Sequence, residues 1–136
     1  MSRWVHVAAV FRIDALGEQS FEDVFGKGIT LPDLDDPDYD YKAEAFDERM
    51  ADQEKHPEDY MPCGSEGSLQ YTIVPNVKNS MPHYEVMVVG NLRDFYDDVS
   101  IVEWFHRSCD RIKWLRQAVI HIKPTHGEDL VFVRRK

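Results

Sequence analysis

Five stretches of the chain have the composition and the spacing of β-strands. Alternation of apolar and polar residues is the pattern of a strand that buries one face. It is clearest in the first stretch, where every second residue from Val5 to Ile13 is apolar and the other face carries His6 and Arg12. The predicted strands are residues 4–13, 68–74, 83–92, 114–124 and 130–135. The second and third are joined by a short loop, which predicts an antiparallel hairpin.

One long helix is predicted over residues 98–112, because apolar side chains recur there at helical spacing. Its apolar face consists of Ile101, Val102, Phe105, Cys109 and Ile112. We expect Trp104 beside this face to lie in the core, and Cys109 to be a small buried hydrophobe rather than a reactive thiol. Suitable N-caps are Asp97, Asp98 and Ser100, and the sequence leaves this choice open.

Two weaker helical segments lie between the first and second strands. Residues 20–25 are bounded by a capping serine and a terminating glycine. Residues 31–41 hold two prolines and five aspartates and predict an extended loop. Residues 41–54 are good helix formers, whose thin apolar stripe consists of Ala43, Phe46 and Met50. A helix with so narrow an apolar face is expected to lie on the surface.

The order of these elements indicates the α+β class, with an antiparallel sheet and segregated helices. The pattern resembles a ferredoxin-like βαββαβ unit, whose first crossover is a long, acidic, partly helical insertion over residues 14–67. In that topology the first strand is central and the strand at 114–124 is its antiparallel neighbour. The 136 residues are expected to form a single domain.

Charge is distributed unevenly along the chain, whose formal net charge is −9. Residues 14–60 hold sixteen acidic and four basic side chains, a net charge of −12, and the rest of the chain has a net charge of +3. Such an acidic segment repels nucleic acid backbones, so direct nucleic-acid binding is not expected. It attracts a basic protein surface, at a rate that depends on salt.

The most acidic loop also contains aromatic residues, which are favoured anchors at interfaces. We therefore expect a partner-binding surface made of Asp35, Asp36, Asp38, Tyr39, Asp40 and Tyr41. The alternative is a solvated segment that only keeps the protein soluble, and the sequence leaves both open. Three of these aspartates alternate as calcium ligands do, but Tyr41 stands where an EF-hand needs glycine and Asp47 where it needs glutamate. No metal is predicted.

The exposed face of the sheet is a second candidate site. Two histidines, a carboxylate and an arginine on one face are suited to bind a small molecule or to transfer protons. These residues are His6, Arg12, Glu85 and His121, with the two histidines expected as cross-strand neighbours. The alternative is an ordinary solvated sheet face. A third use is homo-oligomerisation, for which apolar area is offered by Trp4, Val10, Met87 and Val119.

The loop before the second strand, residues 62–68 with the sequence PCGSEGS, is a further ligand-binding candidate. Its backbone N–H groups suit an anion-binding nest at Gly64, Ser65 and Gly67. A phosphate-binding loop leads into a helix, however, and this one leads into a strand, which favours a structural turn. Cys63 would need a neighbouring base to act as a nucleophile, and the sequence does not place one.

The remaining features concern compartment and class. The two cysteines do not form a Cys-x-x-Cys motif, which favours reduced thiols in the cytoplasm and disfavours a zinc site. No run approaches the roughly 20 apolar residues of a membrane span, and the N-terminus is predicted to be a strand rather than a signal peptide. No membrane attachment and no cofactor are expected.

Together these features favour a non-enzymatic binding module that engages a basic protein partner through its acidic insertion. An inhibitor or adaptor of the kind carried by phages and other mobile elements would have this character. The alternative is a small-molecule-binding or catalytic protein that uses the open sheet face and the Gly-Ser loop.

Overall fold

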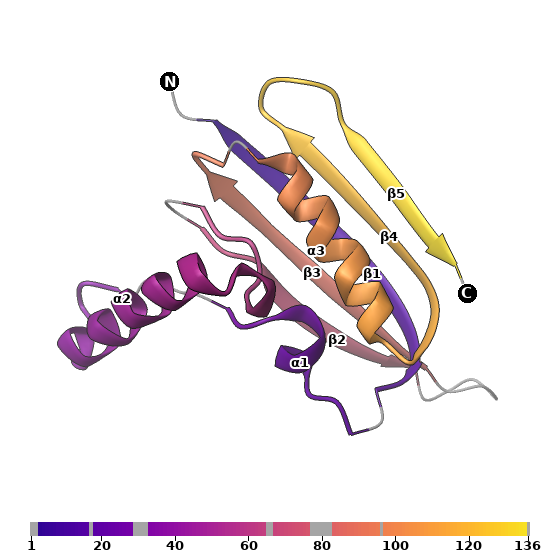
Figure 1. Ribbon diagram of the computed structural model, residues 1–136, viewed down its shortest axis with the longest axis horizontal. Coiled ribbons are helices and arrows are strands. Elements are labelled where there is room, and N and C mark those ends of the chain that lie inside the picture. Colours follow the sequence, from indigo (N-terminus) through magenta and orange to yellow (C-terminus); the bar gives the residue numbers. More distant parts are fainter. Residues whose placement is uncertain are drawn as a thin grey trace.

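The computed structural model describes residues 3–16, 18–28, 33–64, 67–76, 83–95 and 97–135. Within these ranges the chain forms five strands, three helices and a short 3-10 turn, which confirms the predicted α+β class (Figure 1). In chain order they are β1 (Trp4–Ala15), α1 (Phe21–Phe25), α2 (Tyr39–Lys55), the 3-10 turn η1 (Pro57–Asp59), β2 (Gln70–Asn76), β3 (His83–Arg93), α3 (Asp98–Arg111), β4 (Trp114–Pro124) and β5 (Leu130–Arg135).

The strands form one sheet in the order β2-β3-β1-β4-β5, and every neighbouring pair is antiparallel. The central place of β1, its antiparallel pairing with β4 and the β2–β3 hairpin are all as predicted from the sequence. β5 pairs with β4 and extends the sheet by one strand on that side. Pairing with β4 shifts register near Arg12 and Ile13, where irregularities interrupt the ladder.

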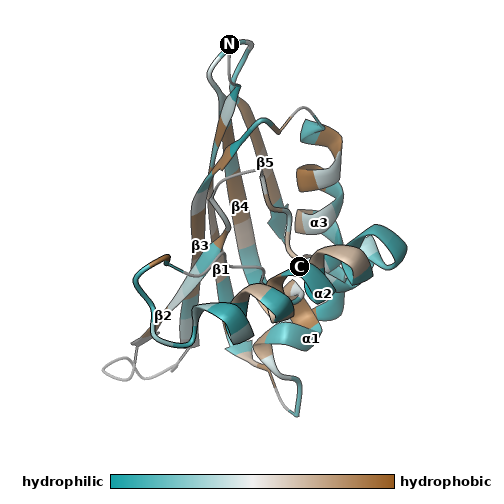
Figure 2. Cartoon of the chain, turned by 90° about the vertical axis from the view of Figure 1, so that its left-hand side faces the viewer, coloured by the Kyte–Doolittle hydropathy of each residue, from teal (hydrophilic) through white to brown (hydrophobic). Residues whose placement is uncertain are grey.

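Helices α1 and α3 lie on one side of the sheet (Figure 2). The predicted apolar face of β1, from Val5 to Ile13, is fully buried beneath them. Phe11 is at the centre of an aromatic cluster, with ring centroids 4.9 Å from Phe25, 6.1 Å from Trp104 and 5.6 Å from Phe105. The buried Trp104 also donates its indole N–H to the carbonyl oxygen of Phe25 at 2.6 Å. Trp104 therefore fixes α1 to α3 as well as filling the core.

The helix ends follow the capping signals of the sequence. Ser20 and Asp23 form a reciprocal capping box, and Gly26 ends α1. Asp97 caps α3, because its side chain accepts the N–H of Ser100, which settles the choice the sequence left open. α2 begins at Tyr39, so the end of the expected loop at residues 31–41 belongs to the first turn of this helix. None of the helices in the described ranges is long and apolar enough to cross a membrane.

Candidate functional site

Residues 33–55, which comprise the aspartate-rich segment and α2, are called here the acidic arm. α2 has seventeen residues and none of them is buried, as its thin apolar stripe predicts. No residue of α2 belongs to the hydrophobic core or to the partly buried side chains packed against it. In Figure 1 the helix extends past the β2 edge of the sheet. The arm is therefore displayed by the fold rather than built into its core.

Three hydrogen bonds attach the C-terminal half of α2 to the framework. Arg49 donates to the carbonyl oxygen of Gly28 at 2.6 Å, Tyr60 donates its hydroxyl to Asp52 at 2.5 Å, and the thiol of Cys63 lies 3.4 Å from Oε1 of Gln53. Tyr60 is buried, and its bond to the Asp52 carboxylate raises its pKa to about 12. These bonds hold one end of the helix at a fixed place.

The other end of the arm carries the residues that the sequence singled out for partner binding. Asp35, Asp38, Asp40 and Tyr41 are exposed, whereas Tyr39 is half-buried. Asp36 binds the ammonium of Lys42 at 2.6 Å and accepts the N–H of Asp38, and these bonds lower its pKa. The Asp36 carboxylate is thus engaged within the arm.

Two large side chains stand out from this acidic surface. Tyr41 is 77% exposed and Leu34 is 83% exposed. Tyr41 was predicted to take part in the site, but Leu34 was not. An apolar residue between aspartates in a loop gives no periodic signal, so its exposure became visible only in the folded chain.

The open face of the sheet, on the side without helices, is the second candidate site. The strand register places Arg12 opposite Glu85 and Gln117, and Arg12 binds both, at 3.5 Å to Glu85 and 3.0 Å to Gln117. His6 lies opposite Lys123, and His121 opposite Ala8. The two histidines, expected as cross-strand neighbours, therefore lie on diagonal positions of the adjacent strands β1 and β4 rather than directly opposite each other.

Each of these histidines has its own polar partner. Nδ1 of His6 lies 2.6 Å from the side-chain oxygen of Asn91, and Nε2 of His121 lies 3.0 Å from the carboxylate of Asp129. The two imidazoles share the face on diagonal positions but are not joined to each other by any hydrogen bond of the described residues. They offer two separate polar points rather than one acid–base pair.

Apolar side chains dominate the middle of the open face. By register, one row runs Met87, Val10, Val119 and Val133 from β3 to β5, and the next row adds Val89, Ala8 and Val131. These seven residues are called the apolar belt; all are exposed or half-exposed. A hollow of about 320 Å³ adjoins the belt and is lined by Val10, Arg12, Gln117, Ala118, Val119, Val133 and Arg135.

The glycine loop has a structural explanation in its described residues. Gly64 donates its N–H to the carbonyl of Gly67 at 3.3 Å, and Cys63 pairs with Ser68, so the described ends of the loop are held together by backbone contacts. Gly67 has a φ of +80°, and a Cβ there would lie 1.9 Å from the carbonyl oxygen of Asn91. Ser65 lies outside the described residues. Ligand binding by this loop stays a prediction.

Both cysteines are free and shielded. Burial raises the pKa of the Cys63 thiol and raises that of Cys109 to about 11. Thiols with raised pKa values are poor nucleophiles at neutral pH. This agrees with the expectation that Cys109 is a small core hydrophobe.

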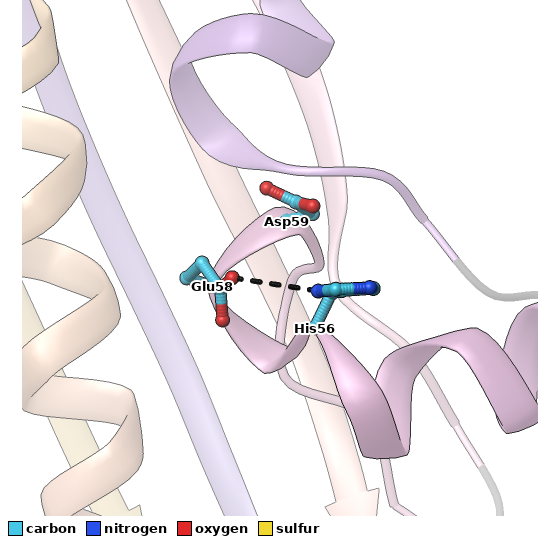
Figure 3. A group of neighbouring side chains, drawn as sticks. All are labelled: His56, Glu58 and Asp59. Carbon is cyan, nitrogen blue, oxygen red and sulfur yellow. Dashed lines mark ion pairs between the residues drawn. The ribbon is translucent and has the colours of Figure 1, made fainter.

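Two features near the end of α2 were missed by the sequence analysis. A hollow of about 340 Å³ lies beside η1 and α3, where burial lowers the pKa of the Arg107 guanidinium. On the surface, ligand atoms of His56, Glu58 and Asp59 lie within 4.8 Å of one another, and His56 Nδ1 is 3.9 Å from Glu58 (Figure 3). All three are exposed, and such acidic groups are common without a metal, so we assign none.

Comparison with known proteins adds no family to this description, since no protein-family model, curated protein or solved structure matches the chain.

Proposed function

We propose that this protein is a binding module that engages a protein partner through the acidic arm. The observation that carries the proposal is that α2 is a complete helix with no buried residue, attached by hydrogen bonds at its C-terminal half. An isolated helix of this length is marginal in water, so the anchors at its C-terminal half help to keep it formed before any partner arrives. Preorganisation of this kind lowers the entropic cost of association.

The chemistry of the arm defines the partner. Between residues 33 and 44 there are six acidic side chains and one lysine. This surface fits a basic partner, which it would attract over long range in a salt-dependent manner. The exposed Tyr41 and Leu34 supply apolar anchors, of the type that contributes most binding energy when it enters a pocket. We therefore infer a partner whose binding surface has an apolar pocket surrounded by basic residues. For this chain we infer the role of a cytoplasmic inhibitor or adaptor, of the kind encoded by phages and other mobile elements.

The test is site-specific photo-crosslinking in the source organism. A photoreactive residue at position 41 should give a discrete adduct with one protein, and the same residue at Val99, exposed on α3, should not. The triple variant Asp35→Lys/Asp36→Lys/Asp38→Lys should lose the adduct while its melting temperature stays nearly unchanged, because exposed ion pairs contribute little. A matched control, Glu18→Lys/Glu103→Lys/Glu128→Lys, changes the net charge equally and should keep it. If the triple aspartate variant still forms the adduct, the arm is not the binding surface.

A second function is favoured by the hollow on the open face. Its apolar floor and its two arginines, Arg12 and Arg135, suit a small molecule that has an acidic head and an apolar body. His6, His121 and Glu85 lie on the same face. Native mass spectrometry of gently purified protein tests the ligand site directly. A small added mass that the His6→Ala/His121→Ala variant loses would support the site. If no added mass is seen at any concentration of the carboxylates tested, the small-molecule function is wrong.

We also propose that the sheet is an elaborated ferredoxin-like unit. The strand order β2-β3-β1-β4, together with α1 and α3 on one face, supports this relation. Residues 14–67 would then be the enlarged acidic first crossover, and β5 an addition at the edge.

A further inference from the structure

The open face of the sheet is large enough for a stable protein interface. Four of its strands, β2, β3, β1 and β4, lie about 4.8 Å apart, with open-face residues about 6.6 Å apart along each strand, and they span a patch of roughly 500 Å². Two such patches pressed together bury about 1,000 Å² in total, the area that a biological interface should reach. The apolar belt occupies the middle of this patch, and a continuous exposed apolar area of this kind marks an interaction surface.

We propose that a second copy of this chain covers the open face, and that the two sheets pack about a two-fold axis that runs along the seam between β1 and β3. The proposal rests on the charges and sizes of the side chains that are paired across this seam. The register pairs Arg12 with Glu85, Val10 with Met87, Ala8 with Val89, His6 with Asn91 and Trp4 with Arg93. A two-fold axis on the seam exchanges the two strands, so each side chain of β1 faces the β3 member of its own pair in the second copy.

Every central contact made in this way is complementary. Arg12 faces a carboxylate and Glu85 faces a guanidinium, so charges alternate around the axis. Val10 and Met87 meet as apolar side chains, and Trp4 faces Arg93 in a pair suited to cation–π contact. Arg12 already lies 3.5 Å from Glu85 within its own chain. Neither charge is therefore left unpaired when the face is covered, which removes the main cost of burying them.

The edge strands fit the same arrangement. The axis places Thr72 and Val74 of β2 over Val119 and Gln117 of β4, which line the hollow of about 320 Å³. Val74 is 42% exposed in the single chain, and it would fill part of this hollow in the dimer. Sheets packed face to face cross at about 30° because they twist, so these matches are closest near the axis and loosen toward the edges.

The first measurement is the mass in solution by sedimentation velocity. At about 100 µM, roughly a hundredfold above a micromolar dissociation constant, the chain of 15.9 kDa should sediment as a dimer of twice that mass. Val119→Arg, in the apolar belt, should raise the dissociation constant at least about 30-fold because it buries a charge without a partner. Val99→Arg on α3 is the matched control and should leave the dimer intact.

Two charge reversals locate the axis. Arg12→Glu and Glu85→Arg each bring like charges together across the seam, and each should weaken its own homodimer at least tenfold, to order of magnitude. Mixed in equal amounts, the two variants should form a heterodimer, because each Glu then faces an Arg of the other chain. Circular dichroism and melting of each variant show that it is folded.

Several outcomes would overturn the proposal. The proposal is wrong if the protein sediments as a monomer at about 100 µM. It is also wrong if Val119→Arg does not weaken the dimer, or if Val99→Arg does. A dimer whose two charge-reversal variants fail to associate on mixing would refute the seam axis. A monomer that carries added small mass would assign the face to a ligand. Reversal of Asp35, Asp36 and Asp38 should leave the dimer unchanged, so failure of the arm proposal and failure of this one are distinguishable.

Discussion

Replacing Gly67 by alanine tests the path of the chain between the acidic arm and the sheet. Gly67 has a φ of +80°, a conformation that side chains of L-residues rarely adopt. A Cβ built there lies 1.9 Å from the backbone oxygen of Asn91 and 3.1 Å from its carbonyl carbon. The obstacle is the backbone of β3 rather than a flexible side chain, so it cannot be moved aside at little cost.

Two energetic costs determine how much Gly67→Ala destabilises the fold. The left-handed backbone costs a non-glycine residue about 1–2 kcal/mol, and forcing extra volume against a packed strand costs about 1–3 kcal/mol. We therefore expect Gly67→Ala to lower the free energy of unfolding by roughly 3 kcal/mol, which corresponds to a fall in melting temperature of roughly 10 °C for a chain of this size. Chemical denaturation followed by circular dichroism measures the loss.

Two further variants separate the terms. Gly67→Asn keeps the added Cβ but tolerates the positive φ, so it should retain most of the steric loss and little of the backbone loss. Gly28→Ala is the control, because its φ is ordinary and its nearest neighbour is the end of the Met61 side chain at 3.5 Å. A Gly67→Ala protein within about 1 kcal/mol of wild type, no worse than typical surface substitutions, would refute the close approach of this turn to β3.

Three further predictions, on stability, pH dependence and thiol reactivity, follow from buried contacts. Trp104→Phe should lower the free energy of unfolding by about 2–4 kcal/mol, because it leaves a cavity and the Phe25 carbonyl without its donor; denaturant titration measures this. The phenol of Tyr60, with its pKa of about 12, should contribute stability that is full below pH 10 and lost as the pH rises from 10 to 12; Asp52→Asn should bring the tyrosinate midpoint back toward 10. The thiol of Cys109, with its pKa of about 11, should resist alkylation in the native state at pH 9 and react on unfolding, as seen by mass.

Each of these has a matched control. Trp114 is 43% exposed, and Trp114→Phe should change stability little; an equal loss in both tryptophan variants would contradict the buried hydrogen bond. A difference spectrum against Tyr60→Phe isolates one phenol among six tyrosines, and a midpoint near 10 in wild type would show that the Asp52 bond does not form. Rapid native labelling of Cys109 would mean that α3 opens far more readily than its buried face implies.

The elements that rest on local chemistry could be predicted from the sequence. Alternation from Val5 to Ile13 identified both faces of β1, and the capping residues fixed the ends of α1. Such signals act within a few residues, so they appear in the sequence itself. The surface position of α2 followed from its thin apolar stripe for the same reason.

Register between strands could not be predicted with equal precision. Side-chain alternation tells which face a residue lies on, but a shift by two residues leaves every face unchanged. His121 therefore fell on the expected face and yet one pair away from His6. The irregularities near Arg12 and Ile13 are a further feature of this pairing that alternation does not reveal.

The anchors of the acidic arm were invisible for a different reason. Tyr60 binds Asp52 and Arg49 binds the Gly28 carbonyl only because the chain reverses at η1 and returns beside α2. A tyrosine and an arginine in an acidic segment have many potential partners, and the sequence alone does not select one. The exposure of Leu34 is likewise a property of the folded surface.

The two proposed surfaces are compatible because the fold keeps them apart. Helices α1 and α3 cover one side of the sheet and the apolar belt lies on the other, while α2 extends past the β2 edge (Figures 1 and 2). A dimer joined through the middle of the open faces would therefore carry one arm beyond the β2 edge of each sheet. Two arms on one rigid body can engage two sites of a repeated or dimeric partner, and the second contact then forms at a high effective concentration. Dimerisation would thus strengthen partner binding without adding any contact to the arm itself.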